Sequence, residues 1–205
     1  LEVYRKTCGL IKQRNPRNTT KNRVESKIDE RQDEEEIKSP QEMIEDSIEE
    51  INSSLADELL DTILDKDPRF FEDLIVDLLV KMGYGQGRAT QYVSDSGIDG
   101  IITTDALGFD PIYTQAKRYA KDHRVGRPEL QAFAGALGNV ARGVFITTSS
   151  FNSSAVDFAS RYPHATIVLI DGQKLSELMI KYDLGVTIER SFQVKRLDID
   201  YFEQA

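Results

Sequence analysis

The sequence contains no tryptophan, one cysteine and only two histidines among its 205 residues. A single cysteine, Cys8, cannot form a disulfide within the chain, so the sequence fits a reducing compartment and we expect a cytoplasmic protein. Nothing clusters cysteine or histidine as a zinc site requires. No apolar run is long enough to cross a bilayer and no secretory signal pattern is present, so we expect no membrane partner.

The formal net charge of −9 argues at first sight against a nucleic-acid partner. The charge is unevenly distributed, however. Residues 1–28 carry eight basic and two acidic side chains, residues 29–64 are strongly acidic, and the remainder is close to balanced. Because the acidity is concentrated in one segment, DNA binding by the rest of the chain is not excluded.

Residues 1–38, basic and then acidic, are open to two interpretations. Residues 10–18 resemble the last helix and wing of a winged-helix DNA-binding domain, which would make the segment a remnant of such a domain. The glycines usual in a wing are absent. A tail or linker without a stable fold is therefore favoured.

A long acidic helix is predicted for residues 39–66. Ser39 can cap it, Pro40 suits its first position and Glu42 completes a capping box. Apolar residues then recur at steps of three and four along one face: Ile44, Ile48, Ile51, Leu55, Leu59 and Ile63. We expect this stripe to be buried, either as the seam of a homodimer or higher homo-oligomer, as an interdomain strut, or against its own domain.

Residues 67–205 are predicted to contain alternating helices and strands. Helices are expected to begin at Asp67–Pro68, Arg127–Pro128, near Asn152 and near Gln173. Buried strands are expected at 143–147 and 166–170, and an edge strand at 186–197. We interpret Gly85–Gly87 as a flexible loop. Helical crossovers between strands indicate an α/β layered domain with a central mixed β-sheet flanked by helices.

The most informative stretch is 93–119. Two runs rich in β-forming residues, ending at Ile102 and beginning at Ile112, flank a connector of turn-forming residues, which indicates a hairpin. In the second run Gln115 and Lys117 share one face with Tyr113, because side chains alternate along a strand. The hairpin brings Asp99 beside Gln115 and Lys117, so an acid, an amide and an ammonium group converge.

Hydrolysis of a phosphodiester could use this cluster. Mg²⁺ prefers oxygen ligands and often takes only one or two carboxylates. Asp99, the Gln115 side-chain carbonyl and the Ala116 backbone carbonyl supply such oxygens, while Lys117 suits a water or a phosphate. A hairpin with a polar outer face and an exposed ion pair would show the same short pattern.

The segments Gly97–Ile102 and Gln115–Tyr119 together resemble the catalytic half of the PD-(D/E)XK nucleases, and more narrowly the Mrr-like restriction endonucleases that act on modified DNA. Further segments agree in order, and the resemblance covers roughly residues 68–186: Phe70–Glu72, Met82–Tyr84, Phe133–Leu137, Gly143–Ser149 and Ile170–Gly172. Gln115 stands where most of the superfamily has an acid. This change removes a charge from the expected metal site.

This resemblance implies a restriction-endonuclease-like fold for residues 67–205, with a catalytic triad of Asp99, Gln115 and Lys117. It implies Mg²⁺ (or Mn²⁺) held by Asp99, Gln115 and Ala116, and an auxiliary role for Glu72. The expected activity is type IV-like cleavage of methylated or otherwise modified foreign double-stranded DNA. Two alternatives stay open: a catalytically weak DNA-binding or sensor module, and a junction-resolving or repair nuclease.

Basic side chains follow the hairpin directly. Arg118, Lys121, Arg124 and Arg127 adjoin the expected site, and we predict that they contact DNA phosphates. A solvated loop is the alternative. His123 lies among them and His164 beside Pro163, and because neither has a partner acid at a useful spacing we assign them no catalytic role.

Overall fold

The computed structural model describes residues 38–89, 97–105 and 107–203, with the Arg88 side chain excepted. Cys8, the basic segment of residues 1–28 and the first part of the hairpin stretch lie outside these residues. The helices are α1 (Pro40–Leu64), α2 (Pro68–Lys81), α3 (Arg127–Leu137), α4 (Ser153–Arg161), α5 (Gly172–Lys181) and α6 (Ile199–Glu203). The strands are β1 (Gln86–Ala89), β2 (Gly100–Thr103), β3 (Pro111–Lys117), β4 (Arg124–Val125), β5 (Arg142–Thr147), β6 (Ser150–Phe151) and β7 (Thr166–Ile170).

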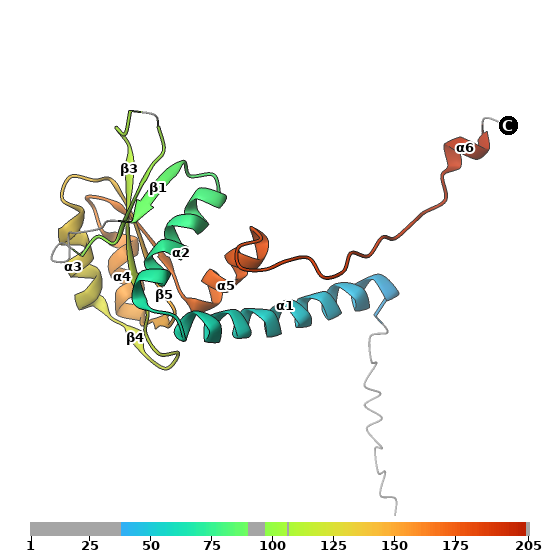
Figure 1. Ribbon diagram of the computed structural model, residues 1–205, viewed down its shortest axis with the longest axis horizontal. Coiled ribbons are helices and arrows are strands. Elements are labelled where there is room, and N and C mark those ends of the chain that lie inside the picture. The colour runs from blue at the N-terminus through green and yellow to red at the C-terminus, as the bar shows by residue number, and fades with distance from the viewer. Residues whose placement is uncertain (1–37, 90–96, 106, 204–205) are drawn as a thin grey trace, which may run out of the picture. The chain divides into compact units, whose positions relative to one another are not determined.

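A five-stranded mixed sheet in the order β1-β2-β3-β5-β7 forms the centre of the domain (Figure 1). Strands β1, β2 and β3 are antiparallel, whereas β5 and β7 extend the sheet from β3 in parallel. The predicted hairpin is confirmed as β2–β3, with Gly100 opposite Thr114. Strands β4 and β6 form a separate two-stranded parallel pair that the sequence did not predict.

The hairpin connector is organised by Asp105. Its carboxylate accepts hydrogen bonds from the backbone N–H groups of Leu107, Phe109 and Asp110 at 2.8–3.2 Å. Thr104 adds a hydrogen bond to the Asp110 carbonyl, and Asp110 forms an ion pair with Arg142 at the start of β5. An acid that accepts from three amides of the same short connector fixes a tight turn, and this turn sets the register of β2 against β3.

Two apolar cores lie on opposite faces of the sheet. One contains side chains of α1, α2 and α5 and includes Ile63, Phe71 and Met179. The other contains side chains of α3 and α4 and includes Phe133 and Ala155. Strand β5 serves both, because Val144 and Ile146 point into the first core and Phe145 into the second. The expected layered fold is therefore confirmed.

The caps predicted for the first two helices are present. Ser39 and Glu42 form the capping box of α1, and Asp67 accepts a hydrogen bond at the start of α2. At the start of α4 the capping side chain is Asn152, whose oxygen accepts from the Ala155 N–H. Helix α3 ends at Leu137, because Gly138 adopts a positive φ that interrupts the helix.

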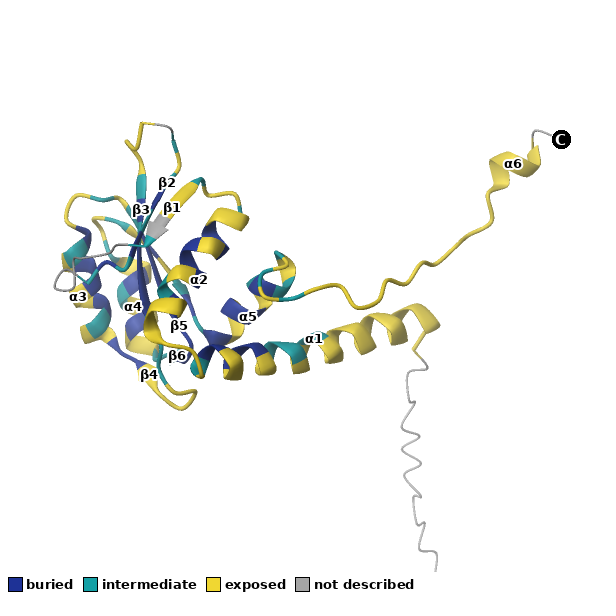
Figure 2. Ribbon diagram, viewed as in Figure 1, coloured by how far each residue is buried: buried dark blue, intermediate teal, exposed yellow. Residues whose placement is uncertain are grey.

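Helix α1 is buried along only part of its length (Figure 2). Leu59, Leu60 and Ile63 are buried and pack toward α5, whereas Ile44, Ile48 and Ile51 are exposed. The expectation of burial against the chain's own domain is thus confirmed for the second half of the stripe and wrong for the first half. No other described segment covers that first half.

Two further expectations are wrong. Gln86 and Gly87 form the edge strand β1 and pair with Thr103 and Ile102, where a flexible loop was predicted. The alternating tail at 186–197 forms no strand within the described chain; Val186 packs partly against the core, and the apolar side chains from Ile188 onward are exposed.

Candidate active site

Asp99 lies immediately before β2 and is fixed to the neighbouring strand by two hydrogen bonds. Its backbone N–H donates to the Thr114 carbonyl at 2.8 Å, and its Oδ2 accepts from the Ala116 N–H at 2.8 Å. The described residues donate no hydrogen bond to Oδ1. The carboxylate is therefore held in one orientation with an oxygen to spare.

Strand β3 presents Gln115, Ala116 and Lys117 in succession. Gln115 is 6% exposed and belongs to the middle of the sheet, whereas Lys117 is half-buried at its end. A Cβ placed on Gly97 would lie 3.3 Å from Gln115 Nε2, so the amide faces the backbone two residues before Asp99. Ala116 points into the core shared with α1, α2 and α5.

The third element is α2, which contributes Glu72. Partial burial raises the pKa of Glu72 above its ordinary value, and the negative charges of Asp99 and Asp73 raise it further. The positive charges of Lys117 and Arg69 oppose this shift. Asp99 and Lys117 both act electrostatically on Glu72, which places acids from two elements and the lysine of a third in one neighbourhood.

The donor atoms fit a hard cation only in part. Asp99 Oδ1, the Gln115 amide oxygen and a backbone carbonyl are oxygen donors of the kind Mg²⁺ accepts, and few protein ligands suffice for an ion that keeps its waters. Across residues 38–89, 97–105 and 107–203, no three His, Cys, Asp or Glu side chains gather to hold a metal. A cation bound by Asp99, Gln115 and a backbone carbonyl would therefore have one charged ligand and two neutral oxygens from these groups.

Hydroxyls after β5 anchor the chain that leaves β3, a role that the sequence did not reveal. Thr147 Oγ1 donates to the Lys117 carbonyl at 2.9 Å. Thr148 Oγ1 accepts from the Tyr119 N–H at 2.9 Å and donates to the Tyr119 carbonyl at 2.6 Å. Spacing in the sequence could not reveal these contacts, because the partners lie about 30 residues away along the chain.

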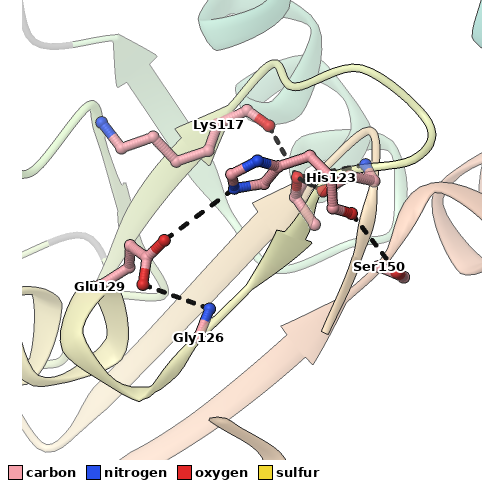
Figure 3. Close-up of polar contacts among 7 residues, drawn as sticks. Lys117, His123, Gly126, Glu129 and Ser150 are labelled. Carbon is pink, nitrogen blue, oxygen red and sulfur yellow. Dashed lines mark hydrogen bonds and ion pairs between the residues drawn. The ribbon is translucent and has the colours of Figure 1, made fainter. Parts of the chain in front are cut away.

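Beyond this anchor the loop turns back toward α3 (Figure 3). His123 Nε2 lies 4.0 Å from Glu129 Oε1, while Glu129 Oε2 accepts from the Gly126 N–H at 3.2 Å. The absence of a partner acid for His123, expected from the sequence, is therefore wrong. The His123 carbonyl also accepts from Ser150 Oγ at 3.5 Å, which closes the loop against β6.

The four basic residues predicted to contact DNA differ in how far they are engaged within the chain. Arg118 donates to the Leu64 carbonyl at the end of α1, and Lys121 forms a 2.7 Å ion pair with Asp61 of the same helix. The Arg127 guanidinium lies 5.4 Å from the centre of the Phe158 ring. Arg124 is exposed and makes no such contact within the described part of the chain.

The chain is similar in sequence to known restriction endonucleases. Residues 63–179 match the family model Mrr_cat, described as a restriction endonuclease. The type IV methyl-directed restriction enzyme EcoKMrr of Escherichia coli (strain K12) is 47% identical over 142 residues, or 66% of this chain and 45% of that protein. The chain thus spans less than half of this curated relative.

Among solved structures, the DNA modification-dependent restriction endonuclease AspBHI matches with a TM-score of 0.53 at 20% identity, over 66% of this chain and 36% of that one. The MspJI restriction endonuclease in complex with a 27-mer oligonucleotide has a TM-score of 0.47 at 23% identity, over 62% and 31%. The AspBHI match supports the fold. The family model covers more than half of the sequence, so this chain belongs to the Mrr-type restriction endonuclease family.

Proposed function

We propose that the chain carries the catalytic domain of a type IV-like restriction enzyme, which hydrolyses phosphodiester bonds in methylated or otherwise modified double-stranded DNA. The observation that carries the proposal is the fixed carboxylate of Asp99, held by β3 next to Gln115 and in the same electrostatic neighbourhood as Lys117 and Glu72. Its substrate is incoming DNA, so the proposed location is the cytoplasm.

Each residue has a distinct proposed role. Asp99, Gln115 and the Ala116 carbonyl would hold Mg²⁺ (or Mn²⁺), which when bound supplies positive charge to the phosphate and acidifies water. Lys117 orients the attacking water and neutralises charge on the phosphate as the transition state forms. Glu72 retains a proton to higher pH than a free glutamate and is an auxiliary group that positions water.

DNA contact is proposed to come from the basic loop after β3. Arg124 and Arg127 have exposed side chains and are the strongest candidates. Arg118 and Lys121 are already engaged in contacts with α1, to the Leu64 carbonyl and the Asp61 carboxylate. For these two we propose a secondary contribution, in which they hold the loop close to the scissile strand.

Two chains are proposed to act together. One site cuts one strand, so a duplex break by a single-site chain is simplest in a homodimer or higher homo-oligomer. The exposed first half of α1 and the exposed tail leave apolar surface available for such association.

A catalytically weak DNA sensor is the second candidate, and Gln115 is the observation that favours it. A buried neutral amide replaces a charged ligand, which lowers the affinity for a divalent cation. Both candidates predict DNA binding, and only the first predicts turnover.

The deciding experiment compares methylated and unmethylated duplexes with Mg²⁺, with Mn²⁺ and with a chelator. Cleavage of the methylated duplex that needs a cation and is lost in Asp99→Asn supports the nuclease. Binding without cleavage under any of these cations contradicts it and supports the sensor.

A further inference from the structure

Strand β7 ends the sheet with an open edge. Within the described chain it pairs with β5 on one side and with nothing on the other. Val168, at its centre, is 48% exposed although it is apolar. An open, apolar strand edge is a template for another strand, and proteins generally cover or disrupt such edges.

A cavity lies on each face of this edge, and the two differ in character. On the α5 face, a cavity of about 310 Å³ is lined mainly by apolar side chains, among them Leu79, Val144, Val168 and Leu178. On the α4 face, a cavity of about 400 Å³ includes polar side chains, among them Ser150, Ser160 and Asp171. An added strand would therefore meet almost wholly apolar surface on one side and mixed polar and apolar surface on the other.

The segment after α5 has the matching pattern. From Ile188 to Val194 the even positions are mainly apolar and the odd positions are Glu189, Ser191 and Gln193. Arg190 interrupts the apolar face, but its long stem can lie along apolar surface. Phe192 is 71% exposed, so within one described chain nothing covers the face that a strand would bury.

The connection argues against parallel pairing within the same chain. Helices α3 and α4 carry the chain from β3 to β5 and from β5 to β7, and both pack on the same face. A third parallel strand, added beyond β7 by a crossover of the same hand, would need its connecting helix on that face. Helix α5 packs on the other face, so the tail could pair in parallel with its own β7 only through a crossover of the opposite, strongly disfavoured hand.

We infer that residues 187–194 of one chain add as a strand to the edge of β7 in a second copy, with Ile188, Phe192 and Val194 over the α5-face cavity. Backbone hydrogen bonds supply affinity and the alternating side chains supply register. This inference deepens the proposal that the protein acts as a homo-oligomer and names the surface through which it associates.

Disulfide trapping tests the pairing and its register. In a Cys8→Ser background, the Val168→Cys chain is mixed in turn with chains carrying one cysteine at each position from 188 to 194, then oxidised without DNA or metal. We expect cross-linked dimers mainly at the one even position that lies opposite Val168 and little at 189, 191 and 193, because alternate side chains point to opposite faces and a disulfide joins only Cα atoms less than about 7 Å apart. Val168→Cys alone serves as the control and is expected to stay monomeric under denaturing conditions.

Sedimentation gives an independent measure. Phe192→Asp is expected to weaken association at least about tenfold, because it places a charge on an apolar cavity. Phe109→Asp is the matched control: Phe109 is another exposed aromatic, located on the hairpin connector, and its substitution is expected to leave association unchanged. Equal effects of the two substitutions, cross-linking at odd positions as strong as at the best even position, or cross-linking only within a Val168→Cys/Phe192→Cys chain would each overturn the inference.

Failure of this inference and failure of the nuclease proposal are distinguishable. Association is measured without DNA or cation, so a chain that cross-links as expected but cuts nothing overturns the nuclease alone. A chain that cuts DNA and still associates after removal of residues 187–205 overturns the strand exchange alone.

Discussion

Two neighbouring stretches of the chain use their charged groups in opposite ways. Between Asp99 and Lys117, the groups proposed for chemistry keep atoms available: Asp99 retains Oδ1, and Lys117 forms no ion pair within the described residues. Between Arg118 and Glu129, most charged side chains already contact the chain itself, as in Arg118–Leu64 and Lys121–Asp61. This difference teaches that nearness to an active site does not by itself identify a group that serves substrate.

Lys117→Ala tests the first stretch, whose charged groups are proposed to act in catalysis, and is expected to have the largest effect. Loss of the ammonium removes a group needed at the transition state, and we expect cleavage to fall by at least about 10³-fold while DNA binding weakens only modestly. Single-turnover cleavage at saturating DNA, together with a binding titration, measures both quantities.

The matched control is Arg124→Ala, which should weaken binding and its salt dependence without changing turnover at saturating DNA. If Lys117→Ala cuts at the wild-type rate with the same cation, the site assignment is wrong.

Arg118→Ala tests the second stretch, whose charged side chains contact the chain itself. Its guanidinium contacts the last turn of α1, and its removal leaves the Leu64 carbonyl without this donor, so we expect a loss of about 1–3 kcal/mol in the free energy of unfolding. Denaturant unfolding measures this loss. Arg124→Ala should change the same quantity by less than about 0.5 kcal/mol, as for an ordinary surface site; equal losses in the two variants would contradict the distinction.

Thr148→Val tests the anchor between the two stretches. The substitution keeps the shape but removes the hydroxyl that binds both the N–H and the carbonyl of Tyr119, and about 1–2 kcal/mol of stability should be lost. Ser150→Ala, whose hydroxyl makes a longer contact to His123, should lose less. The prediction is contradicted if the two denaturation midpoints shift alike.

Glu72→Gln should have the smallest effect, and one that depends on pH. A raised pKa means that the folded protein holds the Glu72 proton more tightly than the unfolded chain, so stability from this group is complete below about pH 4.5 and is lost as pH rises through the folded pKa. Glu72→Gln should therefore be more stable than wild type at pH 7, by less than about 1 kcal/mol, and equal to it at pH 4. Urea unfolding at the two pH values provides the measurement; a gain confined to pH 4 would reverse the assigned sign.

Features that depend on residues close together in the sequence, such as helix caps and hairpins, were predicted correctly. The Ser39 box, the Asp67 cap and the β2–β3 hairpin depend on residues within a few positions of one another, and all are present. The apolar stripe of α1 was also predicted from its periodicity, but the exposure of its side chains differs along the helix. Ile63 is 2% exposed and Ile51 is 66% exposed, because periodicity shows that a face is apolar and not how far the covering domain extends.

Long-range partners could not be predicted. Thr148 binds Tyr119 and Arg118 reaches Leu64 across a sequence separation that no spacing rule covers. Strand β1 was missed because Gly85 and Gly87 favour a loop interpretation. In the structure a Cβ on Gly87 would lie 2.4 Å from the Ile102 side chain, so a glycine is required there by close packing and not by flexibility.

The connector around Asp105 has a consequence for the order of folding. It joins β2 to β3 through only seven residues, whereas the parallel pairing of β3 with β5 must first close the long excursion through β4 and α3. Short loops close quickly and hairpins form within about 1–10 μs, while pairings distant in sequence are slower. Strands β2 and β3 are therefore expected to pair early, which brings Asp99, just before β2, close to β3 and Lys117 before the rest of the sheet forms.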